Sequence, residues 1–228
     1  AGVEALAALG AVDFLMWVVT GISTGLTQGF SIQLSQYYGA KDFENLRKSL
    51  AHSYRLTAFI AAGVLILSQS FASLVLTGLH TPSNIIGMSL LYLRIIFCGI
   101  PATAAYNMFA SALRAMGNSK TPLTAMIIAS VLNVSLDILF VAGFGWGVAG
   151  AAIATVIAQS FSAVYCFLIL RRIDIVHLTR ADFMPASGMN ARLMKLGIPV
   201  VFQNIIIGVG GLVVQYVING YGFLFVAG

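Results

Sequence analysis

Residues 121–170 read TPLTAMIIASVLNVSLDILFVAGFGWGVAGAAIATVIAQSFSAVYCFLIL, and Asp137 is the only charged residue in this run. The run is long enough for two membrane-spanning helices, because one such helix needs about 20 apolar residues. The glycine-rich segment GFGWGVAG, residues 143–150, separates stretches at 122–143 and 148–170. The pattern predicts two antiparallel transmembrane helices joined by a tight turn.

The rest of the chain has the same apolar character. Hydrophobic residues make up 59% of the sequence and charged residues 8%, whereas about 25% of the residues in a typical soluble domain are charged. Long continuous apolar runs favour helices over the alternating strands of a membrane barrel. We therefore predict an all-α polytopic membrane protein with six transmembrane helices. The other four expected spans are 10–36, 52–77, 88–112 and 194–218.

The basic residues predict which helix ends face the cytoplasm. Eleven of the twelve Lys and Arg residues lie in or beside three expected loops, 39–52, 114–121 and 171–193, and Arg94 is the exception. By the positive-inside rule these loops are cytoplasmic in a multi-pass protein of the cell (inner) membrane. Because the basic residues border the spans, the net charge of +5 does not indicate nucleic-acid binding. The last loop fits either a surface amphipathic helix or a plain linker.

Both ends of the sequence have the character of a fragment. The chain has no initiator Met and no Lys or Arg before Lys41, so no signal peptide with a basic start is recognisable. Its last residues, YGFLFVAG, include no polar tail. We expect further protein before Ala1 and after Gly228.

Asp137 is the strongest candidate for a functional residue. A charge at the centre of a membrane helix raises the insertion free energy by about 2.5–3.5 kcal/mol, and such residues usually serve chemistry. Asn133 lies four residues earlier and shares its helix face. After the turn, the next helix presents Ala151, Thr155 and Gln159 at the same spacing.

The distance of these residues from the turn indicates that they meet. At 1.5 Å per residue, Asp137 and Thr155 lie about 9 and 10 Å from the turn, in the outward half of the membrane. Carboxylate, amide and hydroxyl oxygens suit a proton, Na⁺ or another small cation. Alternatively, a protonated Asp137 bonds to Asn133 or Thr155 and only holds the helices together, although such contacts average about 0.6 kcal/mol.

The remaining polar residues within the spans are weaker candidates. Asn107, Gln203 and Asn204 fit either interhelical hydrogen bonds or contacts with a substrate, and Asp13 fits a residue that reaches water. Pro199 fits a hinge or a static bend. The sequence has no GxSxG or HExxH signature, so we do not expect an enzyme or a cofactor.

Several motifs resemble those of multidrug and toxic compound extrusion (MATE) transporters, in particular the prokaryotic DinF-like branch. They are GISTGLTQGFSIQLSQYYGAKDFENLRKS at 21–49, RAMGNSKTP at 114–122, the Asn133-x3-Asp137 helix, GWGVAGAAIATVIAQ at 145–159 and KLGIPVVFQN at 195–204. Their order, spacing and loop polarity match over essentially the whole chain.

The resemblance implies a domain organisation. Members of the family have twelve helices in two lobes, and this chain corresponds to helices two to seven. Residues 1–170 then form most of the N-terminal lobe, 171–193 a cytoplasmic linker, and 194–228 the first helix of the C-terminal lobe. The resemblance also implies that the full-length protein is a monomer.

The resemblance also implies a function. Asp137, Asn133 and Thr155, with the backbone carbonyl of Ala151, match a coupling-ion site for H⁺ or Na⁺. Gln159, like Asn107, Gln203, Asn204 and Pro199, is a candidate residue for substrate contact or gating. The implied activity is cation-coupled antiport that exports small organic, often cationic, drugs or toxic compounds. The alternatives are a lipid-linked precursor flippase of the same superfamily and a membrane protein without transport activity.

Overall fold

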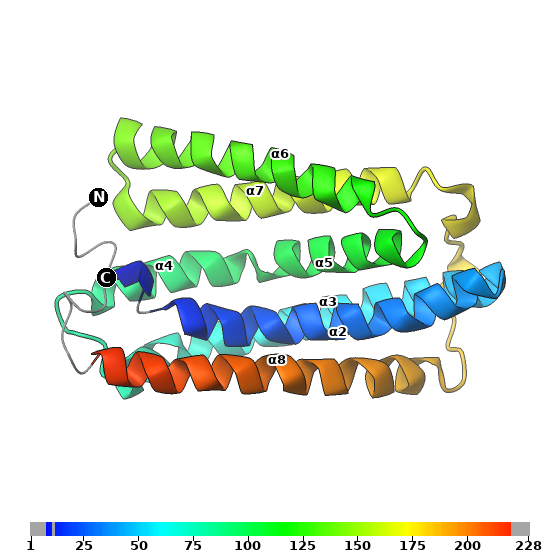
Figure 1. Cartoon of the computed structure of the whole chain (residues 1–228), viewed down its shortest axis with the longest axis horizontal. Coiled ribbons are helices and arrows are strands. Elements are labelled where there is room, and N and C mark those ends of the chain that lie inside the picture. The colour runs from blue at the N-terminus through cyan, green and yellow to red at the C-terminus, as the bar shows by residue number, and fades with distance from the viewer. Residues whose placement is uncertain (1–7, 11, 220–228) are drawn as a thin grey trace.

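The structure is a computed structural model that describes residues 8–10 and 12–219. Helices make up its regular structure and run nearly parallel in one bundle (Figure 1). The long helices are α2 (Asp13–Gly39), α3 (Phe43–Gly78), α4 (Ile86–Cys98), α5 (Ile100–Ala115), α6 (Lys120–Asp137), α7 (Gly147–Leu170) and α8 (Met189–Asn219). The predicted all-α class is confirmed. The outermost parts of the two predicted lobes, 1–7 and 220–228, lie outside the described residues.

The predicted number of six spans is not confirmed. Four described helices are long and apolar enough to cross a membrane, or five if α4 and α5 count as one bent span. α2 is not among them, because its threonine, serine and glutamine side chains make it less hydrophobic. It nevertheless runs alongside the other helices for most of the bundle (Figure 1).

The loop predicted at 39–52 is much shorter in the structure. α3 begins at Phe43, so the loop shrinks to residues 40–42. Asp42 caps this helix, since its carboxylate accepts hydrogen bonds from the backbone and side-chain nitrogens of Asn45. The same bonds hold the pKa of Asp42 below its ordinary value. Charged residues continue the helix beyond the apolar segment, where hydropathy predicts only a loop.

The expected span at 88–112 is broken. α4 and α5 meet at Gly99 with a bend of 46°. Pro101 lies at the start of α5, where its missing N–H group costs no hydrogen bond. The bend therefore lies directly before this proline.

The two halves of the run 121–170 form an antiparallel pair, as predicted (Figure 1). After α6 the backbone continues as a π-helix, η1 (Ile138–Gly143). The turn that follows is tight, and Gly145 and Gly147 adopt positive φ angles of 70° and 54° there. Only glycine takes such angles without strain, which explains why this turn is glycine-rich.

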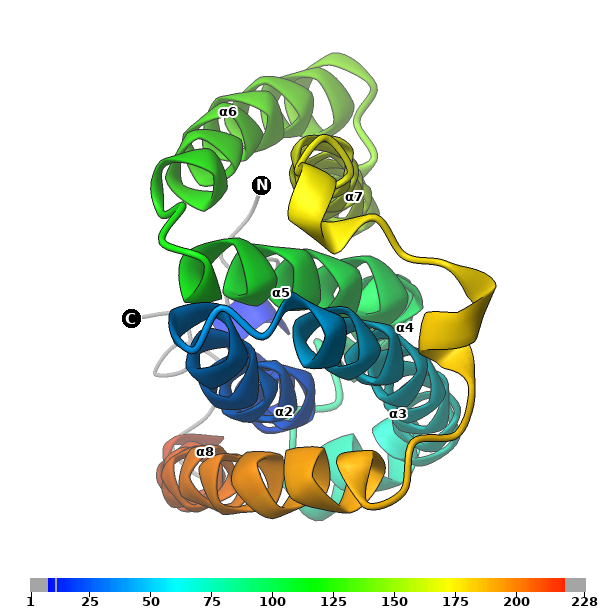
Figure 2. The same ribbon diagram turned by 90° about the vertical axis from the view of Figure 1, so that its right-hand side faces the viewer.

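α2 occupies the centre of the bundle, with α5, α3 and α8 around it (Figure 2). Its contact with α8 depends on glycines one turn apart. A Cβ atom at Gly25 would lie 2.8 Å from the Cα atom of Val201, and one at Gly29 would lie 2.3 Å from the Cα atom of Gly197. Small residues with this spacing permit close approach of membrane helices. The α6–α7 pair lies on the far side of α5 (Figure 2).

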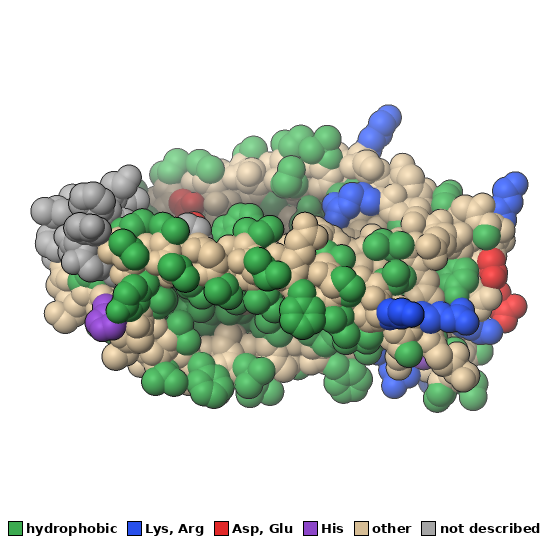
Figure 3. All heavy atoms as spheres, turned by 60° about the horizontal axis from the view of Figure 1, so that its bottom comes forward, with side chains coloured by type: hydrophobic (Ala, Val, Ile, Leu, Met, Phe, Trp, Pro, Cys, Tyr) green, Lys and Arg blue, Asp and Glu red, His purple; other side chains and the backbone are tan. Residues whose placement is uncertain are grey.

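The connection between α7 and α8 contains two short 3-10 helices, η2 (Asp174–Val176) and η3 (Arg180–Phe183). A long amphipathic helix is therefore the wrong alternative for this loop. The connection packs against the start of α3, where Arg55 Nη1 donates a hydrogen bond to the carbonyl of Phe183 at 3.0 Å. Lys and Arg side chains gather toward this end of the bundle (Figure 3), as the orientation prediction requires.

Candidate functional site

The predicted site residues on α6 and α7 are partly brought together. Asn133 Nδ2 donates a hydrogen bond to Thr155 Oγ1 at 3.4 Å. The Thr155 hydroxyl in turn donates to the carbonyl oxygen of Ala151 at 3.0 Å. Three of the four predicted ion-site residues therefore form one chain of polar contacts between neighbouring helices.

Asp137 lies at the junction between α6 and the π-helix η1, one turn beyond Asn133. π-helical turns occur often at functional sites. The side chain is half-buried, and its Oδ1 atom is shielded from solvent without any hydrogen-bond partner. No hydrogen bond joins it to Asn133 or Thr155, so the contact expected of a purely structural aspartate is missing among the described residues. A buried acceptor without a donor favours binding of a proton or a cation.

A cavity of about 200 Å³ lies between α5, α6 and α7 and exposes this polar chain. Asn133, Thr155 and Gln159 line it, together with Tyr106 of α5. The amide oxygen Oε1 of Gln159 is buried and has no hydrogen-bond partner. Gln159 thus adds a second available oxygen acceptor next to the Asn133–Thr155 pair.

The oxygen atoms in this region are suited to a light cation. The potential ligands are the carboxylate of Asp137, the side-chain oxygens of Asn133 and Thr155, and the carbonyl of Ala151. Oxygen ligands suit hard cations, whereas soft metals need Cys or His. No group of three His, Cys, Asp or Glu side chains that could hold a metal occurs in the part of the chain that the structure describes.

The other predicted candidates lie elsewhere. Asn107 on α5 donates to Thr24 Oγ1 of α2 at 3.0 Å, and Asn204 on α8 donates to the carbonyl of Gly21 at 3.1 Å. Both therefore make the interhelical hydrogen bonds that the sequence allowed. Gln203 and Pro199 are exposed on α8 and are not part of the α6–α7 site.

A polar groove lies beside the contact between α2 and α8 and was not predicted from the sequence. It has a volume of about 440 Å³ and is lined by the polar or aromatic side chains of Asp13, Trp17, Thr20, Thr24, Gln28 and Asn204 and by the apolar side chain of Met16. The five polar or aromatic residues from α2 recur at intervals of three or four, which is the periodicity of one helix face. This spacing is visible in the sequence.

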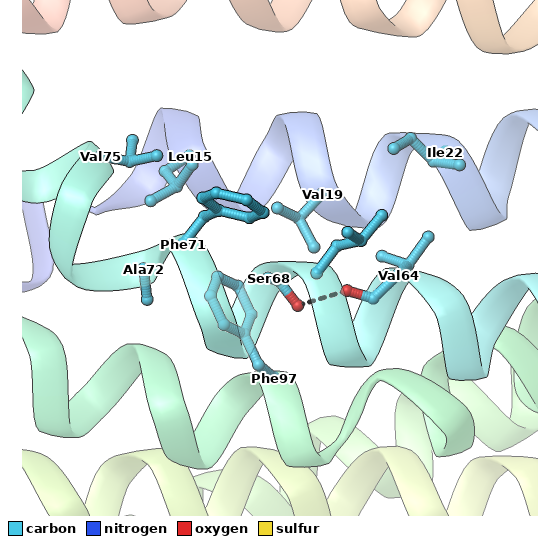
Figure 4. A pocket seen from close by; sticks show the side chains of 10 residues that line it. Leu15, Val19, Ile22, Val64, Ser68, Phe71, Ala72, Val75 and Phe97 are labelled. Carbon is cyan, nitrogen blue, oxygen red and sulfur yellow. Dashed lines mark hydrogen bonds between the residues drawn. The ribbon is translucent and has the colours of Figure 1, made fainter.

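A third cavity is purely apolar and differs in this respect from the two polar cavities. It holds about 210 Å³ between α2, α3 and α4, and Leu15, Phe71 and Phe97 line it (Figure 4). The hydroxyl of Ser68 faces the helix backbone, because it donates to the carbonyl of Val64 at 2.6 Å (Figure 4). This cavity offers no polar group to an ion.

Comparison with solved structures identifies the fold. Two solved structures are similar to the chain at 24% identity. An inward-facing MATE family transporter matches with a TM-score of 0.92 over 99% of this chain and 52% of that one. An outward-facing transporter matches with a TM-score of 0.84 over 90% and 46%.

Sequence comparison identifies the family. The probable multidrug resistance protein YpnP of Bacillus subtilis is 31% identical over 227 residues, 100% of this chain and 51% of the relative. The multidrug export protein MepA of Staphylococcus aureus is 24% identical over 208 residues, 90% and 46% of the two proteins. The chain thus spans about half the length of these relatives. Residues 1–139 match the MatE family model, and the chain therefore belongs to the MatE family.

Proposed function

We propose that the protein containing this chain exports small organic compounds in exchange for an inward-moving H⁺ or Na⁺. Family membership and relatives named as multidrug resistance or export proteins support the export of drug-like compounds. The main support for the exchange mechanism is the unpaired, shielded Oδ1 atom of Asp137, which is the only charged residue between positions 121 and 170.

The energetics of such an exchange are adequate. One positive charge that crosses 100 mV releases about 2.3 kcal/mol. A tenfold concentration ratio requires about 1.4 kcal/mol. One imported cation therefore sustains roughly a 40-fold gradient of a neutral substrate at that voltage.

The residues have distinct roles in this proposal. Asp137 binds the cation or the proton, and Asn133, Thr155 and the Ala151 carbonyl supply neutral oxygen atoms beside it. An ion shifts a conformational equilibrium only if it binds one state more tightly than the other. Asp137 fits this requirement, because a change in the surroundings of a poorly paired carboxylate changes its affinity for the ion.

The two rival functions have less support. A flippase for a lipid-linked precursor needs a cavity with several charges, but Asp13 is the only charged residue that lines the groove between α2 and α8 in the described chain. A protein without transport activity has no use for an unpaired buried carboxylate, whose desolvation is unfavourable.

The test is substrate efflux by the Asp137→Asn variant of the protein expressed from its natural gene. Membrane vesicles are loaded with a fluorescent organic cation, and efflux is followed after an H⁺ or Na⁺ gradient is imposed. We expect gradient-driven efflux to fall to the level of vesicles without the protein, while the amount inserted in the membrane stays the same.

Ser135→Ala is the matched control. Ser135 lies two residues away on the exposed side of α6, and its hydroxyl only donates to the carbonyl of Val131. This variant should transport at the wild-type rate. Wild-type efflux by Asp137→Asn would refute the proposed role of the carboxylate.

A further inference from the structure

The groove between α2 and α8 has the composition of a binding site for an organic cation. Its lining includes one acidic residue, Asp13, and neither Lys nor Arg. Its volume of about 440 Å³ falls in the range typical of small-molecule sites. A groove with a single negative charge and no positive charge favours a cationic ligand over an anionic one.

Trp17 gives the groove an aromatic surface next to that charge. It lies four residues after Asp13 and on the same face of α2, so the two side chains are neighbours. The indole is 61% exposed, as are many large hydrophobic side chains on the outer faces of the helices, and it is therefore accessible to a ligand in the groove. A cation over an indole face is attracted by the electrons of the ring, and Trp is the strongest side chain for this contact.

The other polar side chains that line the groove do not favour contact with lipid chains. Thr20, Thr24 and Gln28 continue the face of α2 that Asp13 and Trp17 begin, and Asn204 of α8 closes it. Gln28 is exposed in the middle of an otherwise apolar bundle. An exposed Trp alone fits a residue at the membrane interface, but a lipid-facing stripe would not carry a carboxylate and an amide.

We propose that Asp13 and Trp17 form the subsite that recognises the positive charge of a transported organic cation. The carboxylate of Asp13 attracts the charge, and the indole of Trp17 stacks against the apolar or aromatic part of the same molecule. The proposal rests on the proposed export function and assigns substrate recognition to α2, separately from the ion site on α6 and α7.

The experiment compares two ions of the same shape and opposite charge. Equilibrium binding of tetraphenylphosphonium and of tetraphenylborate is measured on the detergent-purified protein without any ion gradient. Wild-type protein should prefer the phosphonium cation. Asp13→Asn should weaken phosphonium binding at least tenfold and abolish the preference, while Asp13→Glu should keep it.

Substitutions of tryptophan test the aromatic part. Trp17→Leu should weaken phosphonium binding about threefold to tenfold, and Trp17→Phe should restore most of it. Trp146→Leu is the matched control, because Trp146 is also exposed but lies in the turn before α7, outside the groove. A loss of shape or stability alone would reduce the binding of both probe ions equally, and that result would overturn the subsite.

The outcome also separates this subsite from the proposed coupling mechanism. If Asp13→Asn binds phosphonium like the wild type while Asp137→Asn loses coupled efflux, the subsite is wrong and the mechanism stands. If Asp13→Asn loses the charge preference while Asp137→Asn still transports normally, the subsite stands and the role of Asp137 is wrong.

Discussion

The α6–α7 site and the contact between the linker and α3 use similar polar residues in opposite ways. We call the second region the linker cluster, and it consists of His52, Arg55, Asp182, Met184 and Asn190. His52 is only 2% exposed, yet its Nδ1 atom lies 2.7 Å from Asn190 Oδ1 and its Nε2 atom 3.1 Å from the Met184 carbonyl. In the α6–α7 site, by contrast, Oδ1 of Asp137 and Oε1 of Gln159 have no partner.

The carboxylates of Asp182 and Asp137 differ in the same way in their hydrogen-bond partners. Asp182 is 5% exposed, but its Oδ2 atom accepts hydrogen bonds from the backbone and the hydroxyl of Thr179 at 2.7 and 2.8 Å. Its Oδ1 atom lies 3.8 Å from Arg47 Nε. A carboxylate with all these partners stabilises a local structure, whereas one without partners is available to a ligand. The two carboxylates therefore differ in their hydrogen-bond partners: Asp182 has several, and Oδ1 of Asp137 has none.

The largest difference should appear with Asp137→Asn. We expect this variant to lose all response of efflux to an ion gradient, and to keep the thermal unfolding midpoint of the wild type within about 1 °C. The amide has the shape of the carboxylate, and no hydrogen bond to Asp137 is lost. Transport assays and thermal unfolding in detergent measure the two quantities. A marked fall in the midpoint would assign a structural role to Asp137.

His52→Ala should have the reverse effect. The substitution removes a buried side chain and its contacts to the Met184 carbonyl and the Asn190 amide, which should lower the free energy of unfolding by about 2–3 kcal/mol. His52→Gln keeps one of the two contacts and should lose less. The ion dependence of efflux should remain that of the wild type in both variants. A change in ion dependence would place His52 in the transport mechanism.

Thr155 allows a finer test of the α6–α7 site. Thr155→Ala removes the hydroxyl that joins Asn133 to the Ala151 carbonyl, so the ion concentration needed for half-maximal efflux should rise about threefold to tenfold. Thr155→Ser keeps the hydroxyl and should behave like the wild type. Asn133→Ala should resemble Thr155→Ala. If Thr155→Ser were as impaired as Thr155→Ala, the methyl group rather than the hydroxyl oxygen would be the part of Thr155 that matters.

Arg55→Gln should have the smallest effect. Arg55 is exposed, and its single hydrogen bond to the Phe183 carbonyl should contribute only about 0.5 kcal/mol to the free energy of unfolding. Its loss should leave efflux unchanged. A destabilisation as large as that of His52→Ala would show that the exposed edge of the linker cluster matters as much as its buried centre. Thermal unfolding of both variants under one set of conditions gives the comparison.

Hydropathy predicted the helices of the bundle because apolar length limits where a span can lie. The expected stretches 122–143 and 148–170 agree closely with α6 plus η1 and with α7. The start of α3 was missed, since charged residues such as Lys48 extend a helix beyond the apolar segment. The docking of the linker on α3 depends on contacts like that between His52 and Asn190, 138 positions apart, which no local pattern reveals.

The candidate site was predictable to the same degree. The depth from the turn predicted that Asp137 and Thr155 meet, but the structure joins Thr155 to Asn133, one turn earlier on the same helix face, at 3.4 Å. The unpaired state of Asp137 was not predictable, because it depends on the π-helix and on which donors approach from other helices. The groove on α2 was missed because the isolated residues Asp13 and Gln28 resemble ordinary polar positions until α8 encloses them.

One measurement follows the ion itself. The purified protein is reconstituted into liposomes that contain an indicator for H⁺ or Na⁺, and tetraphenylphosphonium is added on one side without any other gradient. Movement of the substrate should drive the ion in the opposite direction in the wild type and in Ser135→Ala. Asp137→Asn should bind the substrate with wild-type affinity and move no ion. If Asp137→Asn moved the ion with the wild-type stoichiometry, Asp137 would not be the residue that couples the two.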